Sequence, residues 1–498
     1  MAADRTASTC LRLAAMAMAA ALVACEVGPD YERPEAATPA SYKEIGGWKP
    51  SEPGDLADRG PWWSIYKDPQ LDRLEAQVDI SNQNLKAAEA AFREASATVA
   101  EARAGLFPTV AVAASAQRSG QGPGAGTSGG TVSRGRVQNQ FNATASASWE
   151  LDVWGRIRRT VESDVASAQA SAADLAAARL SAQALLATDY LELRIADELK
   201  RLLDDTTVAF ARALQITTNR YQGGIAARSD VASARAQYES TRAQAINVGV
   251  QRAAFEHAIA VLTGEPPAEL TIAAAKFTAI IPAMPPGLPS TLLERRPDIA
   301  AAERRVAAAN AQIGVAVAAY FPALTLSASY GVVSTAIDTL FRAANGVWSF
   351  GPALAQTVFD AGLRGAQVDA ARAFYDQDVA DYRQTVLAAF QQVEDELAAL
   401  RILEQQAEVQ DAAVAAAQEA EELIFNQYTA GTVAYTSVIT AQTVALGNRQ
   451  TALTILQNRL VASVTLLQAL GGGWDAAQLP NDAQIKHGDG RTVPASGS

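Results

Sequence analysis

The chain has 498 residues, a formal net charge of −12 at neutral pH, two cysteines and two histidines. This acidity argues against nucleic acid as a partner, because a phosphate backbone is bound by positively charged surfaces. No nucleophile motif and no cluster with metal-ligand spacing is present, so we predict neither an enzyme nor a bound metal or cofactor. His257 is expected to be a structural or solvated side chain.

The N-terminal segment has the pattern of a secretory signal. Arg5 precedes a small and apolar run over residues 13–24, and Cys25 follows. The tetrapeptide Leu22-Val23-Ala24-Cys25 resembles a bacterial lipobox, in which the signal peptidase cuts before a cysteine that becomes lipidated. We therefore expect a signal peptide over residues 1–24 and a lipid on Cys25; the alternative is an ordinary signal peptide with an incidental cysteine. Glu26, where an aspartate would hold such a lipoprotein at the inner membrane, favours the outer membrane.

Residues 25–67 are expected to form an N-terminal arm, because six prolines between residues 26 and 61 suit an extended segment lying on another surface. A helical pattern follows from Asp68 to Leu106, with Pro69 near its start, where a missing N–H costs little. Phe107-Pro108 ends this pattern.

Beyond Pro108 the hydrophobic period changes from 3.6 to 2. Apolar residues alternate with polar ones over four stretches, at about residues 109–117, 138–149, 323–333 and 347–358. Such strands have one apolar and one polar face, and they suit either a soluble sheet or part of a membrane barrel. Four strands cannot close a barrel, since the smallest have eight, so the membrane alternative requires several copies of the chain.

A glycine-rich segment over residues 119–130 separates the first two strands and contains a G-x-G-x-x-G pattern. A dinucleotide-binding pattern of this kind opens a helix. This one leads into a strand instead, so we interpret it as a loop. If the strands belong to a membrane barrel, we expect this loop outside the cell, because the long loops of such barrels are extracellular.

Residues 156–221 contain no proline and predict one helix of roughly 100 Å, at 1.5 Å per residue. In the corresponding stretch from Gly362 to Tyr428, apolar residues recur at alternating steps of 3 and 4, which indicates a coiled-coil seam. Each long helix is followed by a helix of about half its length and preceded by another. Two such halves stacked end to end would match one long helix.

The landmarks of this pattern occur twice. Gly155 corresponds to Gly362, and Gly264 to Gly471, each at a sequence offset of 207; Pro108 corresponds to Pro322 at an offset of 214. We therefore predict two structural repeats, over residues 68–264 and 290–474, joined by a proline-rich connector over residues 265–289. The polar tail over residues 475–498 is expected to be disordered.

The chain resembles the TolC-like outer-membrane efflux channels, in particular their NodT-type lipoprotein branch. The segments that carry the resemblance are 25–34, 62–63, 68–71, 106–108, 149–156, 294–299, 320–322 and 469–474. It implies a mainly α-helical protein with a membrane β-barrel portion, in which a homotrimer combines four strands per protomer with a long coiled-coil α-barrel. It also implies a passive exit duct for drugs, metals or other small molecules. The implied partners are outer-membrane lipid, a periplasmic adaptor and an inner-membrane pump.

The resemblance also implies that the two turns after the long helices form the periplasmic tip, where the adaptor docks. The residues concerned are Arg220, Tyr221, Gly223, Gly224, Asp230, Tyr428, Gly431 and Thr440. For Asp230 we also consider a plain helix-capping role. Relatives often have an aspartate where this chain has Thr440, so an acidic gate and cation selectivity do not follow.

One alternative class remains, a periplasmic lipoprotein scaffold or adaptor with coiled-coil arms and a soluble β-domain. An adaptor needs a β-barrel domain with a tight core. Here the strands form two hairpins, one per repeat, and each lies between helices, which favours the channel.

Overall fold

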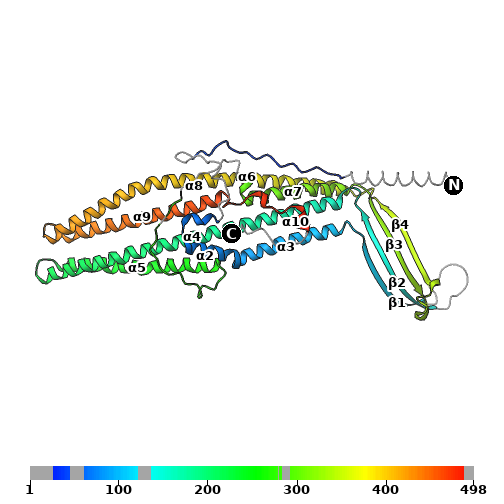
Figure 1. Cartoon of the computed structure of the whole chain (residues 1–498), viewed down its shortest axis with the longest axis horizontal. Coiled ribbons are helices and arrows are strands. Elements are labelled where there is room, and N and C mark those ends of the chain that lie inside the picture. Colours follow the sequence, from blue (N-terminus) through cyan, green and yellow to red (C-terminus); the bar gives the residue numbers. More distant parts are fainter. Residues whose placement is uncertain (1–25, 45–60, 122–135, 279, 283–291, 487–498) are drawn as a thin grey trace.

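The protein is elongated, with long helices along its axis and a four-stranded sheet at one end (Figure 1). A computed structural model describes residues 26–44, 61–121, 136–278, 280–282 and 292–486. The predicted signal peptide, Cys25 and most of the glycine-rich loop lie outside the described residues.

The two longest helices are α4 (Arg156–Gln222) and α8 (Leu363–Thr429), with 67 residues each. Each follows a glycine in the left-handed conformation, Gly155 with φ 82° and Gly362 with φ 91°. Glycine adopts this conformation without a Cβ penalty, so the chain can turn sharply from strand into helix. Both helices are as long as the sequence pattern predicts.

Half-length helices lie beside the long ones. The helices α3 (Gln83–Ala104) and α5 (Arg228–Leu262) pack along α4, whereas α7 (Pro297–Ala318) and α9 (Tyr435–Ala469) pack along α8 and also contact α4. Because α3 continues the line of α5, and α7 that of α9, each pair forms one composite rod (Figure 1).

The halves of each rod meet at a point that we call a junction. At the first junction, Asn82 Nδ2 donates a hydrogen bond to the carbonyl of Leu262, 2.8 Å away. At the second, Arg296 Nη1 donates to the carbonyl of Ala469, 3.0 Å away. Each contact satisfies a carbonyl at a helix C-terminus, where intrahelical partners are missing.

The single helix expected over residues 68–106 is two helices, α2 (Pro69–Ser81) and α3. The break lies at Asn82, whose Oδ1 accepts hydrogen bonds from the backbone N–H groups of Asn84 and Leu85 and so caps α3. The helix expected from residue 290 is likewise divided, into α6 (Leu292–Arg295) and α7. Here Pro297 disfavours helical geometry at the residue before it.

The tail expected to be disordered is partly ordered. It contains a 3₁₀ turn, η6 (Ala476–Gln478), and the short helix α10 (Asp482–Lys486). Ile485 is buried in a cluster with Val99 of α3 and Ala168 of α4. This apolar contact fixes the tail to the helices although its composition is polar.

The sheet is antiparallel and has the order β1-β2-β3-β4, with strands Thr109–Gln121, Arg136–Leu151, Ala323–Ser334 and Gly346–Ala355. Two further 3₁₀ turns, η4 (Ile337–Thr339) and η5 (Ala343–Asn345), connect β3 to β4. The last strand ends at Ala355, before its predicted end at position 358. It contains Pro352, which an edge strand tolerates because one side of that strand needs no ladder hydrogen bonds.

The largest hydrophobic core lies at the level of the junctions, away from the sheet. It joins the 3₁₀ helix η2 (Trp62–Tyr66) and α2 to the middle of α4 and α8. Its fully buried side chains include Leu71, Tyr190 and Tyr382. This core fixes the long helices while leaving the sheet and the opposite helical ends free for other contacts.

Candidate functional site: exposed sheet and helical tip

The register of the strands sorts the sheet into two chemically different faces. One face carries the rows Val110–Ala147–Ala328–Phe350 and Val112–Ala145–Tyr330–Trp348. Between them on the other face lies the row Ala111–Ser146–Ser329–Ser349. The predicted alternation within each strand is therefore aligned across all four strands.

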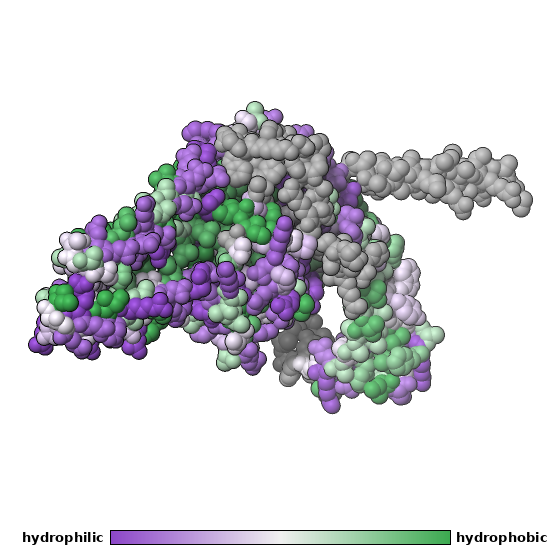
Figure 2. Space-filling view, turned by 60° about the vertical axis from the view of Figure 1, so that its left-hand side comes forward, coloured by the Kyte–Doolittle hydropathy of each residue, from purple (hydrophilic) through white to green (hydrophobic). Residues whose placement is uncertain are grey.

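The apolar face is open to the surroundings. Exposed fractions are 73% for Val110, 82% for Val112, 77% for Trp348 and 66% for Phe350. Figure 2 shows hydrophobic surface gathered on the sheet, while hydrophilic and hydrophobic surface are mixed along the helices. A large exposed apolar surface marks contact with a membrane or another protein.

Both edges of the sheet are also free among the described residues. β1 pairs only with β2, and β4 only with β3. Unpaired edge groups are costly in lipid and promote association in water, so both edges are sites where further strands could pair.

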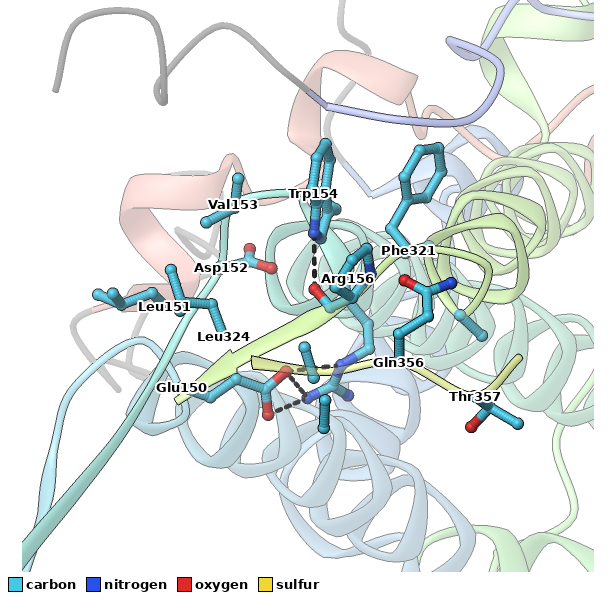
Figure 3. A pocket seen from close by; sticks show the side chains of 15 residues that line it. Glu150, Leu151, Asp152, Val153, Trp154, Arg156, Phe321, Leu324, Gln356 and Thr357 are labelled. Atoms are coloured by element: carbon cyan, nitrogen blue, oxygen red, sulfur yellow. Dashed lines mark hydrogen bonds and ion pairs between the residues drawn. The ribbon is translucent and has the colours of Figure 1, made fainter. Parts of the chain in front are cut away.

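Aromatic residues gather where the sheet meets the helices. Trp154 stacks on Phe321 with ring centroids 4.7 Å apart, and its Nε1 donates to the carbonyl of Pro322 at 2.8 Å (Figure 3). Phe107 comes just before β1 and Phe359 just after β4, and they are exposed by 68% and 85%. Rings of this kind favour a membrane–water interface.

Figure 3 shows a pocket of ≈ 370 Å³ at this level, lined by the end of β2, the start of α4 and the segments flanking β3 and β4. Its one arginine, Arg156, donates to Glu150 through Nε at 3.1 Å and through Nη2 at 2.8 Å. The described residues include no group of His, Cys, Asp and Glu that could hold a metal ion. Among them, no helix has both the length and the hydrophobicity to cross a membrane.

At the opposite end, two turns reverse the chain. Gly224 has φ 71° and Gly431 has φ 80°, the left-handed conformation expected from their places after the long helices. The N–H of Ile225 donates to the carbonyl of Arg220 at 2.8 Å, and the N–H of Thr432 to that of Gln427 at 3.0 Å. Each bond joins a residue to the fifth one before it, as in a Schellman cap.

The structure brings two of the predicted tip residues together. Arg220 lies over the ring of Tyr428, 4.7 Å from its centroid, and donates through Nη1 to the carbonyl of Thr429 at 2.8 Å. The two hairpins of one protomer are therefore joined by a cation–π contact and a charge-assisted hydrogen bond. Tyr221, Gly223 and Gly224 are exposed beside them.

Tyr435 completes this contact and was not predicted from the sequence. Its ring lies 5.1 Å from that of Tyr428, and both residues are buried with Ala234 and Val438. Burial raises the pKa of the Tyr435 phenol to about 12. The repeat gave no signal for it, because the corresponding position in the first copy is Arg228.

The remaining two residues lie on the helices that leave the tip. Ala227, and not Asp230, is the N-cap of α5; Asp230 stands in the first turn of this helix and accepts from the N–H of Ala227 at 3.4 Å. Thr440 is exposed on α9, and its Oγ1 donates to the carbonyl of Thr436 at 3.0 Å. No acidic group stands at position 440.

This geometry agrees with comparisons to known proteins. The model of the outer membrane efflux protein family matches residues 76–265 and 288–472. The toluene efflux pump outer membrane protein TtgC of Pseudomonas putida is 30% identical over 90% of this chain and 93% of its own. The pyoverdine export outer membrane protein OpmQ of Pseudomonas aeruginosa is 32% identical over 85% and 89%.

A solved structure of the outer-membrane channel OprN superposes with a TM-score of 0.83 at 30% identity, over 90% of this chain and all of that one. The chain belongs to the outer membrane efflux protein family. Its predicted fold class, its outer-membrane location and its role in efflux are thereby confirmed, and the scaffold alternative is set aside. The family is one of channels and not a class of enzymes.

Proposed function

We propose that three copies of this chain form a passive exit duct for small molecules such as drugs, across the outer membrane and the periplasm. In this duct the three sheets close into one barrel of twelve strands, and the helices continue it as a tube. A periplasmic adaptor and an inner-membrane pump complete the system. The observation that carries the proposal is the sheet, with two free edges and an exposed apolar face.

Closure of the sheet accounts for both of its faces. In a closed barrel each β1 edge meets a β4 edge of the next copy, so no backbone group is left unpaired in lipid. The rows with Val112 and Trp348 would then face lipid, and the row with Ser146 and Ser329 the lumen. This is the alternation of membrane barrels, apolar outside and polar inside.

The helices provide an independent argument for association. On α5, exposed residues facing away from α4 recur at alternating steps of 4 and 3: Ala232, Ala236, Glu239, Ala243, Ile246 and Val250. On α8, exposed residues facing away from α9 recur at the same steps: Gln405, Val409, Ala412, Ala416, Glu419 and Leu423. We call these the α5 seam and the α8 seam; each is a coiled-coil face without a partner in the protomer.

The two seams match in height above the tip. Ile246 follows Gly224 at the same separation in sequence at which Val409 precedes Gly431, because 246 − 224 equals 431 − 409. Both are therefore about 33 Å from the turns, at 1.5 Å per residue. The other five positions of each seam correspond in the same way, so the α5 seam of one copy fits the α8 seam of the next, layer by layer.

The tip is the proposed adaptor site, because its exposed Tyr221 and Ile225 stand next to two turns that Arg220 and Tyr428 hold together.

Lipidation of Cys25 is also part of the proposal. The N–H of Val27 donates to the carbonyl of Trp154 at 3.2 Å, so the arm begins at the aromatic level below the sheet. Small molecules are the proposed substrate class, and the names of the two relatives refer to toluene and to pyoverdine.

Cysteine crosslinking tests the assembly. Ile246→Cys together with Val409→Cys should give a disulfide-linked ladder ending at the trimer in isolated outer membranes. The matched control pairs Ile246→Cys with Asp411→Cys, which is also exposed but lies two positions along, on the opposite side of α8. Absence of a ladder from the first pair, or an equal ladder from both, would contradict the proposed packing.

A further inference from the structure

The arm over residues 26–44 lies along the outside of α7 and α8 (Figure 1). It begins beside α4 and ends beside the middle of α8, so it crosses from the first repeat to the second. We call its two attachment points the upper clamp, around Arg159, and the lower clamp, around Glu394.

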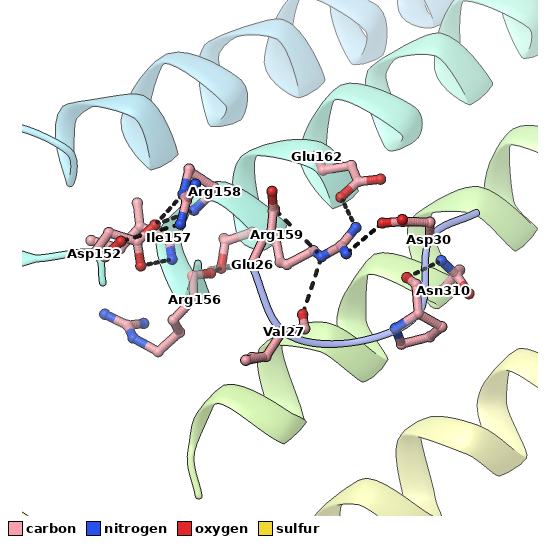
Figure 4. A network of polar contacts seen from close by, with 12 residues as sticks. Glu26, Val27, Asp30, Asp152, Arg156, Ile157, Arg158, Arg159, Glu162 and Asn310 are labelled. Carbon is pink, nitrogen blue, oxygen red and sulfur yellow. Dashed lines mark hydrogen bonds and ion pairs between the residues drawn. The ribbon is translucent and has the colours of Figure 1, made fainter. Parts of the chain in front are cut away.

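The upper clamp surrounds one buried arginine with arm groups. The Arg159 side chain is only 4% exposed; its Nη2 donates to Asp30 at 2.8 Å, and its Nε to the carbonyl of Val27 at 3.3 Å (Figure 4). Glu162 of the same helix accepts from Nη1 at 2.7 Å, and Glu26 lies 3.4 Å from Nε. Asp30 itself is 95% exposed, so the arm reaches this guanidinium from the surface. Without the arm, the guanidinium would keep Glu162 alone as an ionic partner among these.

Two glycines allow the arm to lie this close. A Cβ on Gly28, which has φ 102°, would come within 2.5 Å of the Cα of Gly314 on α7. A Cβ on Gly314 would come within 2.9 Å of the Arg159 side chain. Asn310 closes the layer by donating through Nδ2 to the carbonyl of Pro29 at 3.0 Å. Arm backbone, α7 backbone and Arg159 are therefore packed without space for a methyl group.

The lower clamp uses one carboxylate for two backbone donors. Glu394 on α8 accepts from the N–H of Lys43 at 2.7 Å and from the N–H of Glu44 at 2.9 Å. Arg401, two turns further along α8, pairs with the Glu44 carboxylate. Tyr42, between the clamps and 2% exposed, belongs to the main hydrophobic core. Because two adjacent backbone N–H groups of the arm bind the same carboxylate, the arm is held at a defined position along α8.

The attachment has a consequence for α8. Within the protomer α8 packs against α7 and α9, and its free side carries the α8 seam. The arm adds an outer link between α8 and α4 of the first repeat, besides the links through α7 and α9. We propose that the arm is a strap that holds α8 in the position required for its seam to meet the α5 seam of the next copy. This inference rests on the proposed trimer.

The strap is tested by releasing its upper end. Gly28→Val introduces a Cβ where none fits, in a segment outside the helices, and Arg159→Met removes the charge while keeping an apolar stem. Thr38→Val is the control, because Thr38 is an exposed arm residue whose Oγ1 donates to Ala36 of the arm itself. Cleavage after the exposed Glu32 by a glutamyl endopeptidase reports arm release, and the Ile246–Val409 crosslink reports trimer.

We expect Gly28→Val and Arg159→Met to speed cleavage after Glu32 and to lower the trimer crosslink, each by about tenfold. Gly28→Val places a side chain where the arm touches α7, and Arg159→Met removes the donor to Asp30 and Val27. Thr38→Val should change neither. Arm release with an unchanged trimer would overturn the strap, as would an arm that stays resistant in both variants. A wild-type chain without any crosslink would instead overturn the proposed trimer itself.

Discussion

The two junctions occupy equivalent places in the repeat, since the positions of Asn82 and Arg296 differ by 214, the offset of the upstream part of the repeat. They are nevertheless built from different chemistry. At the first, a neutral amide contacts the end of α5. At the second, Arg296 contacts the end of α9, pairs with Asp298 and reaches Gln392 of α8 at 2.9 Å. The second junction is therefore connected to a long helix by its capping residue, whereas the first is not. The two repeats therefore share the contact to a helix C-terminus but differ in the side chain that makes it.

The backbone contacts beside the two caps are more alike than the caps. A Cβ on Gly264 would lie 2.3 Å from the carbonyl oxygen of Ser81, and one on Gly471 would lie 2.1 Å from that of Arg295. Both glycines have positive φ, 73° and 92°. The close approach of backbone to backbone is thus common to both repeats, and only the side chains distinguish them.

The largest loss of stability is expected when a side chain is placed at either of these two glycines. Gly471→Val and Gly264→Val should each destabilise the protein by at least ~4 kcal/mol, because a side chain at positive φ is strained and the Cβ overlaps a backbone atom. Protease digestion of isolated membranes is the measurement: the helices of the variants should be cleaved under conditions in which those of the wild type resist. A stable Gly471→Val protein would show that the halves of the rod do not meet as described.

Substitution of the two capping residues should show that the junctions contribute different amounts to stability. Arg296→Met should cost about 3–5 kcal/mol, since it leaves the buried end of α9 and Gln392 without their partner. Asn82→Ala should cost about 1–2 kcal/mol, the usual effect of losing a cap. Urea midpoints of the two purified variants give the comparison. Equal midpoints would remove the distinction between the junctions.

A buried carboxyl on α2, the helix that precedes the first junction, should make the stability of the protein sensitive to pH. Glu75 on α2 has no exposed surface, and neither of its carboxylate oxygens has a hydrogen-bond partner. Burial, with Asp79 and Asp72 nearby, raises its pKa from 4.5 to about 9. The unfolded chain releases this proton above its ordinary pKa of 4.5, so folding stability is fully present below that value and falls as pH rises toward 9.

Glu75→Gln removes this titration while preserving shape. We expect it to stabilise the protein by about 1–3 kcal/mol at pH 7, and to be close to neutral near pH 4, because the carboxyl is then mostly protonated in both states. Urea midpoints across this pH range are the measurement. A variant with the same pH slope as the wild type would show that Glu75 is ionised in the folded protein.

A small effect on stability is expected at the tip. A Cβ on Gly224 meets no atom within 4 Å, so Gly224→Val should cost only about 1–2 kcal/mol, from the left-handed backbone alone. Trimer abundance should stay unchanged while drug susceptibility rises, because the proposed adaptor site is altered. Gly431→Val is the matched variant in the second repeat. If transport falls only in proportion to the trimer, the turn has a structural role and the docking proposal loses its support.

The sequence predicted the long elements well because their signals are local. Sustained alternation of apolar and polar residues indicates strands, and an uninterrupted 67-residue pattern indicates a long helix. The break at Asn82 was missed because no residue before it ends a helix. The contact that Asn82 makes across the junction is to the carbonyl of Leu262, 180 positions away in sequence. The ordered tail was missed for the same reason, since Ile485 depends on Val99.

The tip shows the same limit. Gly224 and Gly431 could be assigned from their places after long helices, because a tight reversal needs left-handed geometry. The pairing of Arg220 with Tyr428 joins positions from different repeats and has no local signal. Tyr435 could have been found only as an apolar aromatic residue in the first turn of α9, a weak indication.

The free edges of the sheet affect how the amount of channel depends on the amount of chain. A lone protomer carries two unpaired edges and an uncovered apolar face, so it is a short-lived species in water. When three copies assemble reversibly from dilute protomers, the trimer concentration follows the cube of the protomer concentration. Halving the free protomer would then lower the trimer about eightfold. Export would therefore rise steeply with expression while most of the chain is free protomer, and only in proportion to expression once most of it is assembled.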